Sequence, residues 1–383
     1  MRFSCLQENL NKALSMVGRA VATRTTLPIT QNVLIGTEGG RIKLTATNLE
    51  IAITTWIGGK VEDEGSITVP ARLFSDFVAS LPEGQVEVAL TPKPLGIQIT
   101  SSQSEGRVLG TSGEEFPLVP TVDEGVGLSI GSRLLREAIE KIAFAAATED
   151  SRPVLTGVKM EIDGEKATFA AADGFRLAVK GTKLSRAVAS PISCIIPART
   201  LRELERLLSD QVDPVEFTVT SQKNQVMFKL KDVELVSQLI QGAFPNYSQL
   251  IPQDYSTRTT VGLGEFTRAI RTASVFARDG SGIVRIHVTP GSEGEAGKMV
   301  ISARADEVGD NTGTIEASVQ GEEAKIAFSG KYLTDVLSVL GTDVVALETT
   351  TSSSPGVVRS AGPDGAPTDD DYVHVVMPMF VQW

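Results

Sequence analysis

The sequence predicts an α+β protein in which one repeat, two helices packed on antiparallel sheet, occurs three times along the chain. The first observation is a motif: ITVPARLF (67–74) recurs 127 positions later as CIIPARTL (194–201), and a weaker copy, IAFSGKYL (326–333), follows after another 132. The second is an amphipathic segment upstream of each copy, at 9–21, 134–146 and 265–277. The third is the length, because 383 residues divide into three repeats of about 128.

The elements of a repeat follow one another in a constant order. A short strand leads into the first helix, and paired runs such as 41–47 and 50–56 alternate in part between apolar and polar residues, which indicates half-buried antiparallel strands. The second helix is expected after the V/I-P-A-R motif, because proline suits the end of a strand or the turn before a helix. Strands such as 214–220 and 225–230 close the repeat. The predicted helices are 7–20, 71–80, 132–142, 198–208, 265–278 and 331–340.

Turn-forming residues cluster at 123–127 and 253–257, where we expect the repeats to be joined. The predicted domains are therefore residues 1–125, 126–253 and 254–383. One segment does not fit a packed repeat: residues 352–371 are rich in Ser, Pro, Gly and Asp, which predicts a long mobile loop. A solvated surface loop is favoured there over a binding element.

Composition argues against several classes of function. The two cysteines, Cys5 and Cys194, are far apart and give neither a disulfide framework nor a zinc site, which is typical of a reducing cytoplasm. With two histidines, His287 and His374, general bases and metal ligands are scarce. No signal peptide, apolar membrane-length run, Walker A, G-x-S-x-G or H-E-x-x-H pattern is found. We expect no catalytic residue, metal or cofactor, although a hydrolase using carboxylate pairs among the 47 acids remains an alternative.

The charge distribution changes the first interpretation of the composition. A net charge of −11 argues against a nucleic-acid partner, yet the six predicted helices carry thirteen Lys and Arg against eight Asp and Glu. The remaining sequence holds 23 basic and 39 acidic residues, so the net charges are +5 on the helices and −16 elsewhere. Basic residues recur at helical spacing, opposite leucine-type residues such as Leu201, Leu204 and Leu208.

A single helix with a charged face is ordinary for a protein surface, but the same face in three repeats predicts a continuous positive surface. Such a surface suits phosphates that are bound without sequence preference. No helix-turn-helix, zinc finger or RNP motif is present to read bases.

Four short stretches carry a family resemblance: TLPI (26–29), AADGFRLA (171–178), FPNY (244–247) and VVMPM (375–379). In this order and spacing, from Met1 to Met379, the chain resembles the bacterial DNA polymerase III β subunit, the sliding clamp family. The resemblance implies three clamp domains per chain and a head-to-tail, ring-shaped homodimer with helices lining the hole. It implies a non-catalytic processivity factor that encircles double-stranded DNA. The implied partners are the DNA polymerase III catalytic subunit, the clamp loader, repair polymerases, ligase and mismatch-repair proteins.

The expected DNA-binding residues come mostly from the basic helix faces, while Arg24 and Arg152 match family positions at the ring face. A tyrosine pair often found after the latter is Pro153-Val154 here. The complete set is Lys12, Arg19, Arg24, Arg72, Arg133, Arg136, Lys141, Arg152, Arg199, Arg202, Arg206, Arg268, Arg271 and Arg278.

The family also implies a hydrophobic pocket for short peptide motifs between the central and last repeats. Its wall would be Leu155, Ala172, Gly174, Phe175, Arg176, Leu177, Pro245, Gln249, Leu250, Val375, Val376, Met377, Pro378 and Met379, with Ser329, Tyr332, Thr351 and Ser353 on the neighbouring groove. Methionine and valine make an adaptable apolar surface. Without the resemblance, Met377 and Met379 fit ordinary core positions.

The expected pocket departs from the family at two places, and the expected dimer interface leaves an alternative. Phe175 stands where the family usually has histidine or tyrosine, and the chain ends in FVQW (380–383) instead of a basic terminus, so Trp383 could fold into the pocket or cover its rim. The expected dimer interface is Arg107, Val108 and Leu109 against Val275 and Phe276, the last two being equally suited to the core of the third repeat. A repeat scaffold that does not bind DNA is the remaining alternative, and retention on circular but not linear DNA would separate the two.

Overall fold

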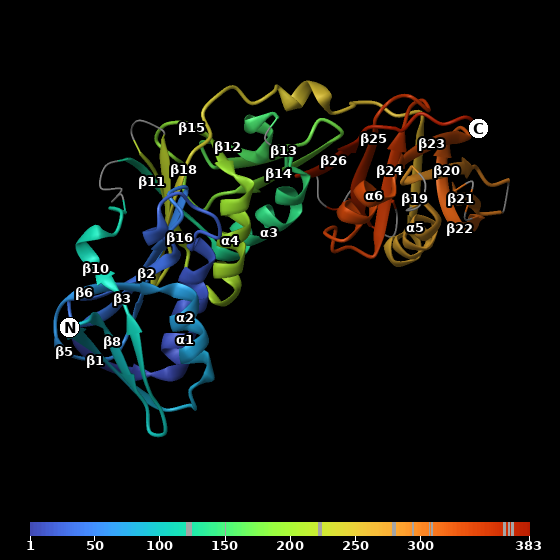
Figure 1. Ribbon diagram of the computed structural model, residues 1–383. Helices are drawn as coiled ribbons and strands as arrows, with labels where there is room; N and C mark the ends of the chain where they lie inside the picture. The colour runs from blue at the N-terminus through green and yellow to red at the C-terminus, as the bar shows by residue number, and fades with distance from the viewer. Residues whose placement is uncertain are drawn as a thin grey trace. The chain divides into compact units, whose positions relative to one another are not determined.

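A computed structural model of the chain describes all residues except 120–124, 150, 221–223, 278–280, 293–294, 306, 308, 363–364, 367 and 369–370, and the side chains of 125–126. Within the described residues, the predicted helices are confirmed to within a few residues at their ends (Figure 1). They are α1 (Gln7–Val17), α2 (Ala71–Ser80), α3 (Ser132–Ile142), α4 (Ala198–Leu207), α5 (Leu263–Ala277) and α6 (Gly330–Leu337).

The chain divides into two compact units, and the first contains residues Met1–Leu135 and Arg199–Leu239. Its strands are β1 (Arg2–Leu6), β2 (Asn32–Glu38), β3 (Arg41–Thr47), β4 (Ile51–Ile57), β5 (Lys60–Asp63), β6 (Ser66–Pro70), β7 (Gln85–Pro92), β8 (Leu95–Thr100), β9 (Glu105–Leu109), β10 (Thr111–Ser112), β11 (Gly125–Ile130), β16 (Val215–Thr220), β17 (Gln225–Lys229) and β18 (Val233–Gln238). They form a five-stranded sheet in the order β5-β1-β7-β8-β9 and a nine-stranded sheet in the order β10-β6-β2-β3-β4-β18-β17-β16-β11. The helices α1 and α2 lie side by side in this unit (Figure 1).

The second unit contains residues Arg136–Ala198 and Ile240–Trp383. Its strands are β12 (Gly157–Asp163), β13 (Lys166–Ala172), β14 (Arg176–Lys183), β15 (Ile192–Pro197), β19 (Thr257–Gly262), β20 (Ile283–Thr289), β21 (Gly297–Ala305), β22 (Gly309–Gly321), β23 (Ala324–Ser329), β24 (Val344–Thr349), β25 (Gly356–Ala361) and β26 (Tyr372–Val376). They form one sheet in the order β15-β12-β13-β14-β26-β25-β24-β19-β22-β21-β20-β23. The helices α5 and α6 contact each other, and α5 packs on β20, β21 and β22.

The repeated motif marks the same junction in all three repeats. Pro70 ends β6 directly before α2, and Pro197 ends β15 directly before α4. In the third repeat Ser329 takes the place of proline, and its Oγ accepts a hydrogen bond from the Tyr332 backbone N–H at 3.5 Å, which caps α6. The prediction of a strand that runs straight into a helix is therefore confirmed.

Neighbouring repeats share their sheets. β4 of the first repeat pairs antiparallel with β18 of the second, and β14 of the second pairs antiparallel with β26 of the third. These two pairings explain why the compact units do not coincide with the repeats: each unit contains strands from two repeats joined by main-chain hydrogen bonds.

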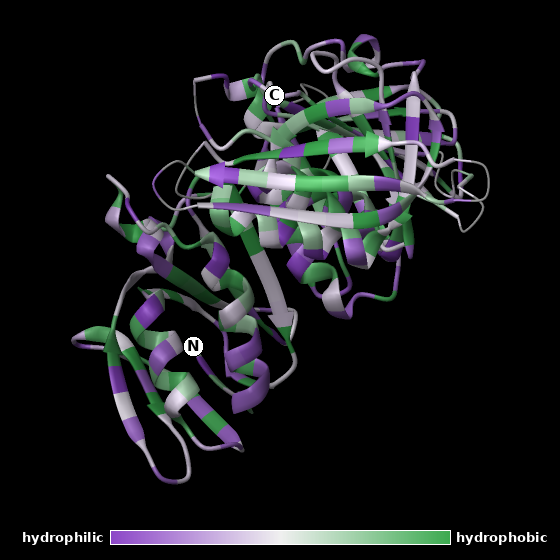
Figure 2. Ribbon diagram, turned by 90° about the vertical axis from the view of Figure 1, so that its right-hand side faces the viewer, coloured by the Kyte–Doolittle hydropathy of each residue, from purple (hydrophilic) through white to green (hydrophobic). Residues whose placement is uncertain are grey.

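Apolar side chains meet between helix and sheet, as the strand alternation predicts. Along β20 the buried residues alternate with partly exposed ones, and Figure 2 shows hydrophilic and hydrophobic residues alternating along strands. The strands β3 and β4 are more deeply buried than the half-buried pattern we expected.

The expectation of a long mobile loop over 352–371 is wrong for its middle. Residues Gly356–Ala361 form β25, which lies between β24 and β26, and Val357 and Val358 are buried. The short apolar stretch was hidden by the Ser, Pro, Gly and Asp around it, although two adjacent β-branched residues favour a strand.

Candidate nucleic-acid interface and peptide pocket

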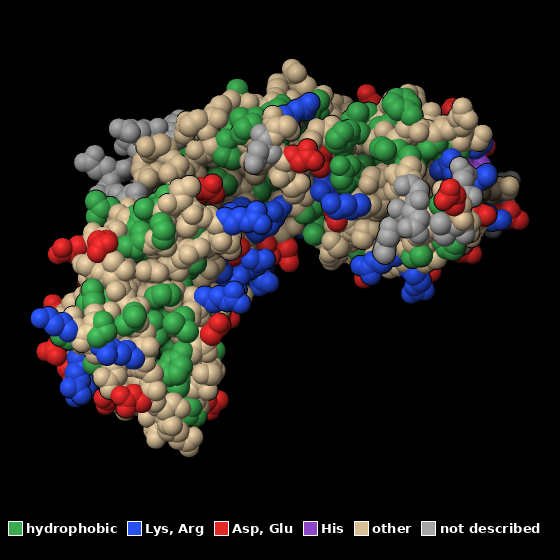
Figure 3. All heavy atoms as spheres, in the orientation of Figure 1, with side chains coloured by type: hydrophobic (Ala, Val, Ile, Leu, Met, Phe, Trp, Pro, Cys, Tyr) green, Lys and Arg blue, Asp and Glu red, His purple; other side chains and the backbone are tan. Residues whose placement is uncertain are grey.

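The helices α1 and α4 of the first unit each turn an apolar face inward and a basic face to solvent. Leu10 and Leu14 of α1 and Leu201 and Leu204 of α4 are buried. Lys12 on α1 and Arg199 and Arg206 on α4 are exposed, and Arg202 on α4 is half-buried. Arg19, in the 3-10 turn that follows α1, is exposed as well. Figure 3 shows Lys and Arg side chains gathering along α4. The arrangement offers cations on a helical surface, which suits phosphates that are bound without sequence preference.

Acidic side chains lie among these cations. Lys12 Nζ is 2.8 Å from Asp210 Oδ2, and Glu203 accepts hydrogen bonds from Arg19 and Arg206 at 3.4 and 2.7 Å. The basic face of the first unit is therefore partly neutralised.

The other expected DNA-binding residues differ in their surroundings. Arg268 and Arg271 are exposed on α5, opposite the buried Phe266 and Ile270. The remaining exposed members of the set are Arg24, Arg72, Arg133, Arg136 and Arg152. Arg278 lies outside the described residues.

Lys141 does not fit the expected basic face. Its side chain is buried, its Nζ lies 3.2 Å from Glu137 and 5.4 Å from the centre of the Tyr372 ring. Five positions separate it from Arg136, about 140° around the helix, which places it at the edge of the buried face.

The expected peptide pocket has a buried apolar floor in the second unit. Leu155, Ala172, Leu177 and Val375 belong to one cluster of buried residues, together with Val179, Val357 and Val373, and Phe244, Tyr247 and Ile251 pack against it. Val376 does not belong to the floor. It is fully buried but adjacent to Val375 on β26, so its side chain points to the opposite face of the sheet.

A pocket of about 480 Å³ is lined by five of the predicted residues, Leu155, Gly174, Phe175, Arg176 and Tyr332. The lining residues that the prediction missed for this site are Ala146, Ala147, Thr148, Glu149, Ser151, Asp173 and Lys331, and Arg152 lines it as well. Asp173 could have been found, because it stands inside the AADGFRLA motif. The segment 146–151 carries no comparable signal.

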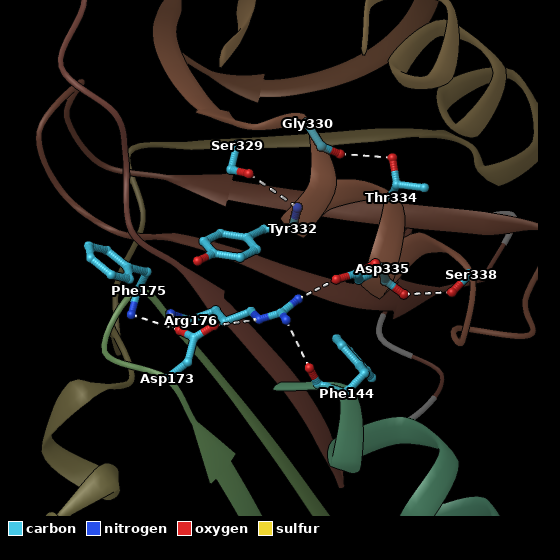
Figure 4. Close-up of polar contacts among 10 residues, drawn as sticks. All are labelled: Phe144, Asp173, Phe175, Arg176, Ser329, Gly330, Tyr332, Thr334, Asp335 and Ser338. Atoms are coloured by element: carbon cyan, nitrogen blue, oxygen red, sulfur yellow. Dashed lines mark hydrogen bonds and ion pairs between the residues drawn. The ribbon is translucent and has the colours of Figure 1, made fainter. Parts of the chain in front are cut away.

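Arg176 joins the parts of this pocket (Figure 4). Its Nε donates to Asp173 Oδ2 at 3.0 Å, its Nη1 to Asp335 Oδ2 of α6 at 2.6 Å and its Nη2 to the backbone oxygen of Phe144 at 2.8 Å. The guanidinium also lies over the ring of Tyr332, 4.4 Å from its centre. One buried cation thus connects the β13–β14 turn, α6 and the segment after α3.

The turn that presents Phe175 is fixed by Asp173. Its Oδ1 accepts hydrogen bonds from the backbone N–H groups of Phe175 and Arg176 at 2.9 and 3.0 Å. Gly174 has a φ of +94°, which other residues rarely adopt. Phe175 is therefore held with 59% of its surface exposed beside the pocket.

The other predicted pocket residues lie outside the lining. Pro245, Gln249 and Leu250 are exposed on the segment whose Phe244 and Tyr247 pack on the floor, and Thr351 and Ser353 form an exposed turn. Ser329 caps α6. Met377, Pro378 and Met379 follow β26, with the Met377 N–H donating to the Phe175 oxygen at 2.8 Å.

The chain end runs away from the pocket. The Met379 N–H donates to the backbone oxygen of Ala327 on β23 at 2.7 Å, and Arg285 on β20 donates to the backbone oxygen of Gln382 at 3.4 Å. No residue of 380–383 lines the pocket, so the idea that Trp383 folds into it is wrong in this structure.

The expected dimer residues are partly accessible. Val275 on α5 and Leu109 on β9 are 60% and 59% exposed, Arg107 is exposed, and Phe276 is half-buried. Val108 is buried within its own unit and so offers no surface to a partner.

Each unit also has a strand with an open edge. β9 is the last strand of the five-stranded sheet, and the stretch 309–316 of β22 pairs with β21 on one side only. The residue pattern did not predict the open edge of β22.

Neither a metal site nor a membrane span is found in the described part of the chain. No three His, Cys, Asp or Glu side chains gather closely enough to hold a metal ion there. No helix among these residues is long and apolar enough to cross a membrane.

Sequence profiles of one family match nearly the whole chain. Residues 1–120 match the DNA polymerase III beta subunit N-terminal domain, 129–246 its central domain and 248–380 its C-terminal domain. The chain is 32% identical over 389 residues to the Beta sliding clamp of Bacillus subtilis, covering 99% of both chains. It is 31% identical to that of Synechococcus elongatus, covering 95% of this chain and 96% of the other.

Solved structures are similar over the full length. The crystal structure of the DNA polymerase sliding clamp from Bacillus subtilis has a TM-score of 0.92 at 30% identity, with 100% of both chains covered. A sliding clamp from Pseudomonas aeruginosa bound to griselimycin has a TM-score of 0.90 at 27% identity, again with both chains fully covered.

Proposed function

The chain belongs to the DNA polymerase III beta subunit family, the bacterial sliding clamps, and from this premise we propose which of its surfaces hold DNA, bind peptides and close the ring. As a sliding clamp it is a processivity factor of DNA replication with the three-domain clamp fold. The observation that carries the function is the match of three consecutive family domains over one chain that carries basic helices in each repeat.

The proposed DNA surface is the set of exposed basic residues on the helices. Lys12 on α1, Arg199 and Arg206 on α4, and Arg268 and Arg271 on α5 support it because these helices bury their apolar faces. Arg19, in the 3-10 turn that follows α1, is exposed beside them. Since the ring holds DNA by enclosing it, the phosphate contacts need only be weak and exchangeable.

The proposed partner site is the pocket around Phe175 and Arg176. Leu155 belongs both to its lining and to the buried apolar cluster, and fixed polar groups such as Asp173 and Arg176 stand around it. This combination suits a short apolar peptide segment, such as those we expect in the polymerase catalytic subunit, the clamp loader and repair proteins. Griselimycin, bound to the Pseudomonas aeruginosa clamp, is a convenient probe for such a site.

We further propose that two chains close the ring head to tail through β9 of one and the α5–β22 region of the other. Open strand edges pair readily with another chain, and Leu109 and Val275 add exposed apolar surface beside them. The proposed domains are residues 1–125, 126–253 and 254–383.

The proposed role requires no chemistry from this chain. We infer that it is a non-catalytic subunit acting in the cytoplasm beside the polymerase.

The function is tested by topology. The protein, loaded on nicked circular DNA by a clamp loader, should be retained during gel filtration and should be lost after the circle is linearised. Equal retention on circular and linear DNA would instead support a scaffold that binds DNA by surface contact, and no retention on either would exclude an encircling ring.

A further inference from the structure

Carboxylates set into the basic helical face of the first unit have no place in the function derived so far. A groove of about 540 Å³ runs between α1 and the end of α4, and its lining includes Lys12, Arg19, Arg206 and Asp210. Lys12, Arg19 and Arg206 belong to the proposed DNA surface, and an acid lies against each of these three cations.

Glu203 holds two arginines at once. Its Oε2 accepts from Arg19 Nη1 at 3.4 Å, and its Oε1 accepts from Arg206 Nη1 at 2.7 Å. The Glu203 side chain is only 13% exposed, whereas those of Arg19 and Arg206 are 35% and 56% exposed. Each oxygen of the poorly exposed Glu203 carboxylate thus accepts a hydrogen bond from one arginine, while the two guanidinium groups remain accessible to solvent.

Asp210 pairs with Lys12 at the exposed surface of this face. Their side chains are 71% and 60% exposed and lie 2.8 Å apart, and the hydrogen bond from Lys12 lowers the pKa of the Asp210 carboxyl. The Asp210 carboxyl is therefore charged at neutral pH while it pairs with Lys12. An ion pair this exposed to solvent is weak, so a phosphate can displace it at a small cost.

We propose that Glu203 and Asp210 are affinity-setting residues that weaken the grip of this face on DNA by competing with phosphates for Lys12, Arg19 and Arg206. The proposal rests on the proposed DNA surface. Each phosphate contact to these cations replaces a carboxylate contact, so the net gain per contact is small and contacts exchange readily as the ring moves. Removing the carboxylate charges frees the cations and tightens binding.

The same contacts could have the opposite effect on DNA binding, if Glu203 aligns the two arginines toward the phosphates. If Glu203 mainly holds the two arginines in a productive position, its removal lowers DNA affinity. The sign of the change therefore distinguishes competition from alignment.

The test measures binding of the full-length protein to a short linear duplex by fluorescence anisotropy, at several salt concentrations. The double variant Glu203→Gln and Asp210→Asn should bind about threefold to tenfold more tightly at about 0.1 M salt, with a slope of log K against log salt steeper by about one to two. Asp210→Asn alone should give part of this increase in affinity, and it should leave the fold intact because the Asp210 side chain is exposed.

A matched control changes the net charge equally on the sheets of the same unit. Glu38, at the end of β2, pairs with Lys43, and Asp232, just before β18, pairs with Arg41. The double variant Glu38→Gln and Asp232→Asn should leave the affinity within about twofold of the parent.

The outcomes distinguish a failure of the proposed competition from a failure of the proposed DNA surface. Unchanged or weaker binding by the Glu203 and Asp210 variants, or equal tightening by the control, overturns the competition. If reversing the arginines of α4 to glutamate also leaves binding unchanged, the DNA surface itself is wrong. If that reversal weakens binding while the carboxylate variants have no effect, the DNA surface stands and only the competition is refuted.

Discussion

At the scale of single residues, the pocket depends on one guanidinium whose three nitrogen atoms are all hydrogen-bonded. Arg176 is buried against Asp173 and Asp335, and both carboxylates come from different elements of the same unit. Because a buried ion pair is most costly when one partner is removed, this residue supports both the fold of the unit and the shape of the pocket.

Replacing Arg176 by Gln should destabilise the protein by about 3 kcal/mol, because two poorly exposed carboxylates lose their common partner. It should also weaken griselimycin binding, since Tyr332 and the Asp173 turn lose the group that aligns them. Denaturant unfolding and calorimetry measure the two effects. Arg186→Gln, at an exposed position, is the control and should change neither. Unchanged affinity in the Arg176 variant would show that the pocket is shaped without it.

His374 offers a second prediction at this scale. It is fully buried on β26 and stacks on Phe144 with ring centres 5.5 Å apart, and burial followed by the Arg176 charge lowers its pKa from 6.5 to about 3. The unfolded chain binds a proton that the folded chain excludes, so this contribution to stability is complete above about pH 6.5 and falls as the pH drops toward 3.

Between pH 7 and pH 5, His374 should therefore lower the free energy of unfolding of the parent by about 2 kcal/mol. The variants His374→Leu and His374→Gln should not show this part of the decrease. The two variants can differ in absolute stability, since Leu is apolar and Gln is not. Chemical unfolding at the two pH values measures the change. The same pH dependence in parent and variants would contradict the buried neutral state.

At the scale of elements, the six helices were predictable because each combines an amphipathic period with a fixed place in the repeat. The pocket floor could not be assembled from the pattern alone, because Leu155, Leu177 and Val375 come together only through strand pairing across two repeats. Lys141 was misassigned because helical spacing is ambiguous at the edge of a buried face. The family resemblance found Phe175 and Arg176, which no local rule distinguishes.

The basic face of α4 carries the third prediction. Reversing Arg199, Arg202 and Arg206 to glutamate should weaken binding to duplex DNA more than tenfold and flatten the salt dependence by up to about three units of slope, because phosphate contacts are replaced by repulsion. Anisotropy titrations over a range of salt concentrations measure both. The solution mass should stay that of the parent, which confirms that the ring is intact. An unchanged slope would refute the assignment of α4 to the DNA surface.

At the scale of the whole molecule, the acidic composition and the basic helices are compatible because the excess of acidic residues lies outside the helices. The net charge of −11 disfavours indiscriminate binding of nucleic acid, while the proposed DNA surface consists of basic residues on the helices. Composition alone pointed away from DNA, and the position of the charges along the repeats corrected it.

The ring itself carries the fourth prediction. Val275→Glu should shift the protein from dimer to monomer at micromolar concentration, because it places a charge on an apolar patch at the proposed interface. Sedimentation or light scattering measures the mass. Val212→Glu is the control, since Val212 is 90% exposed on the first unit and outside the proposed interface. A monomeric parent, or a dimeric Val275 variant, would contradict the proposed contact.

The sheets shared between repeats bear on how such a ring opens. Five residue pairs link β4 to β18, and five link β14 to β26, so two repeats of one chain part only if a row of main-chain hydrogen bonds breaks together. The proposed contact between two chains involves neither of these pairings, so it can open while the sheets within each chain stay intact. The shared sheets therefore hold neighbouring repeats of one chain together, which leaves the proposed contact between two chains as the place where we expect the ring to admit a DNA circle.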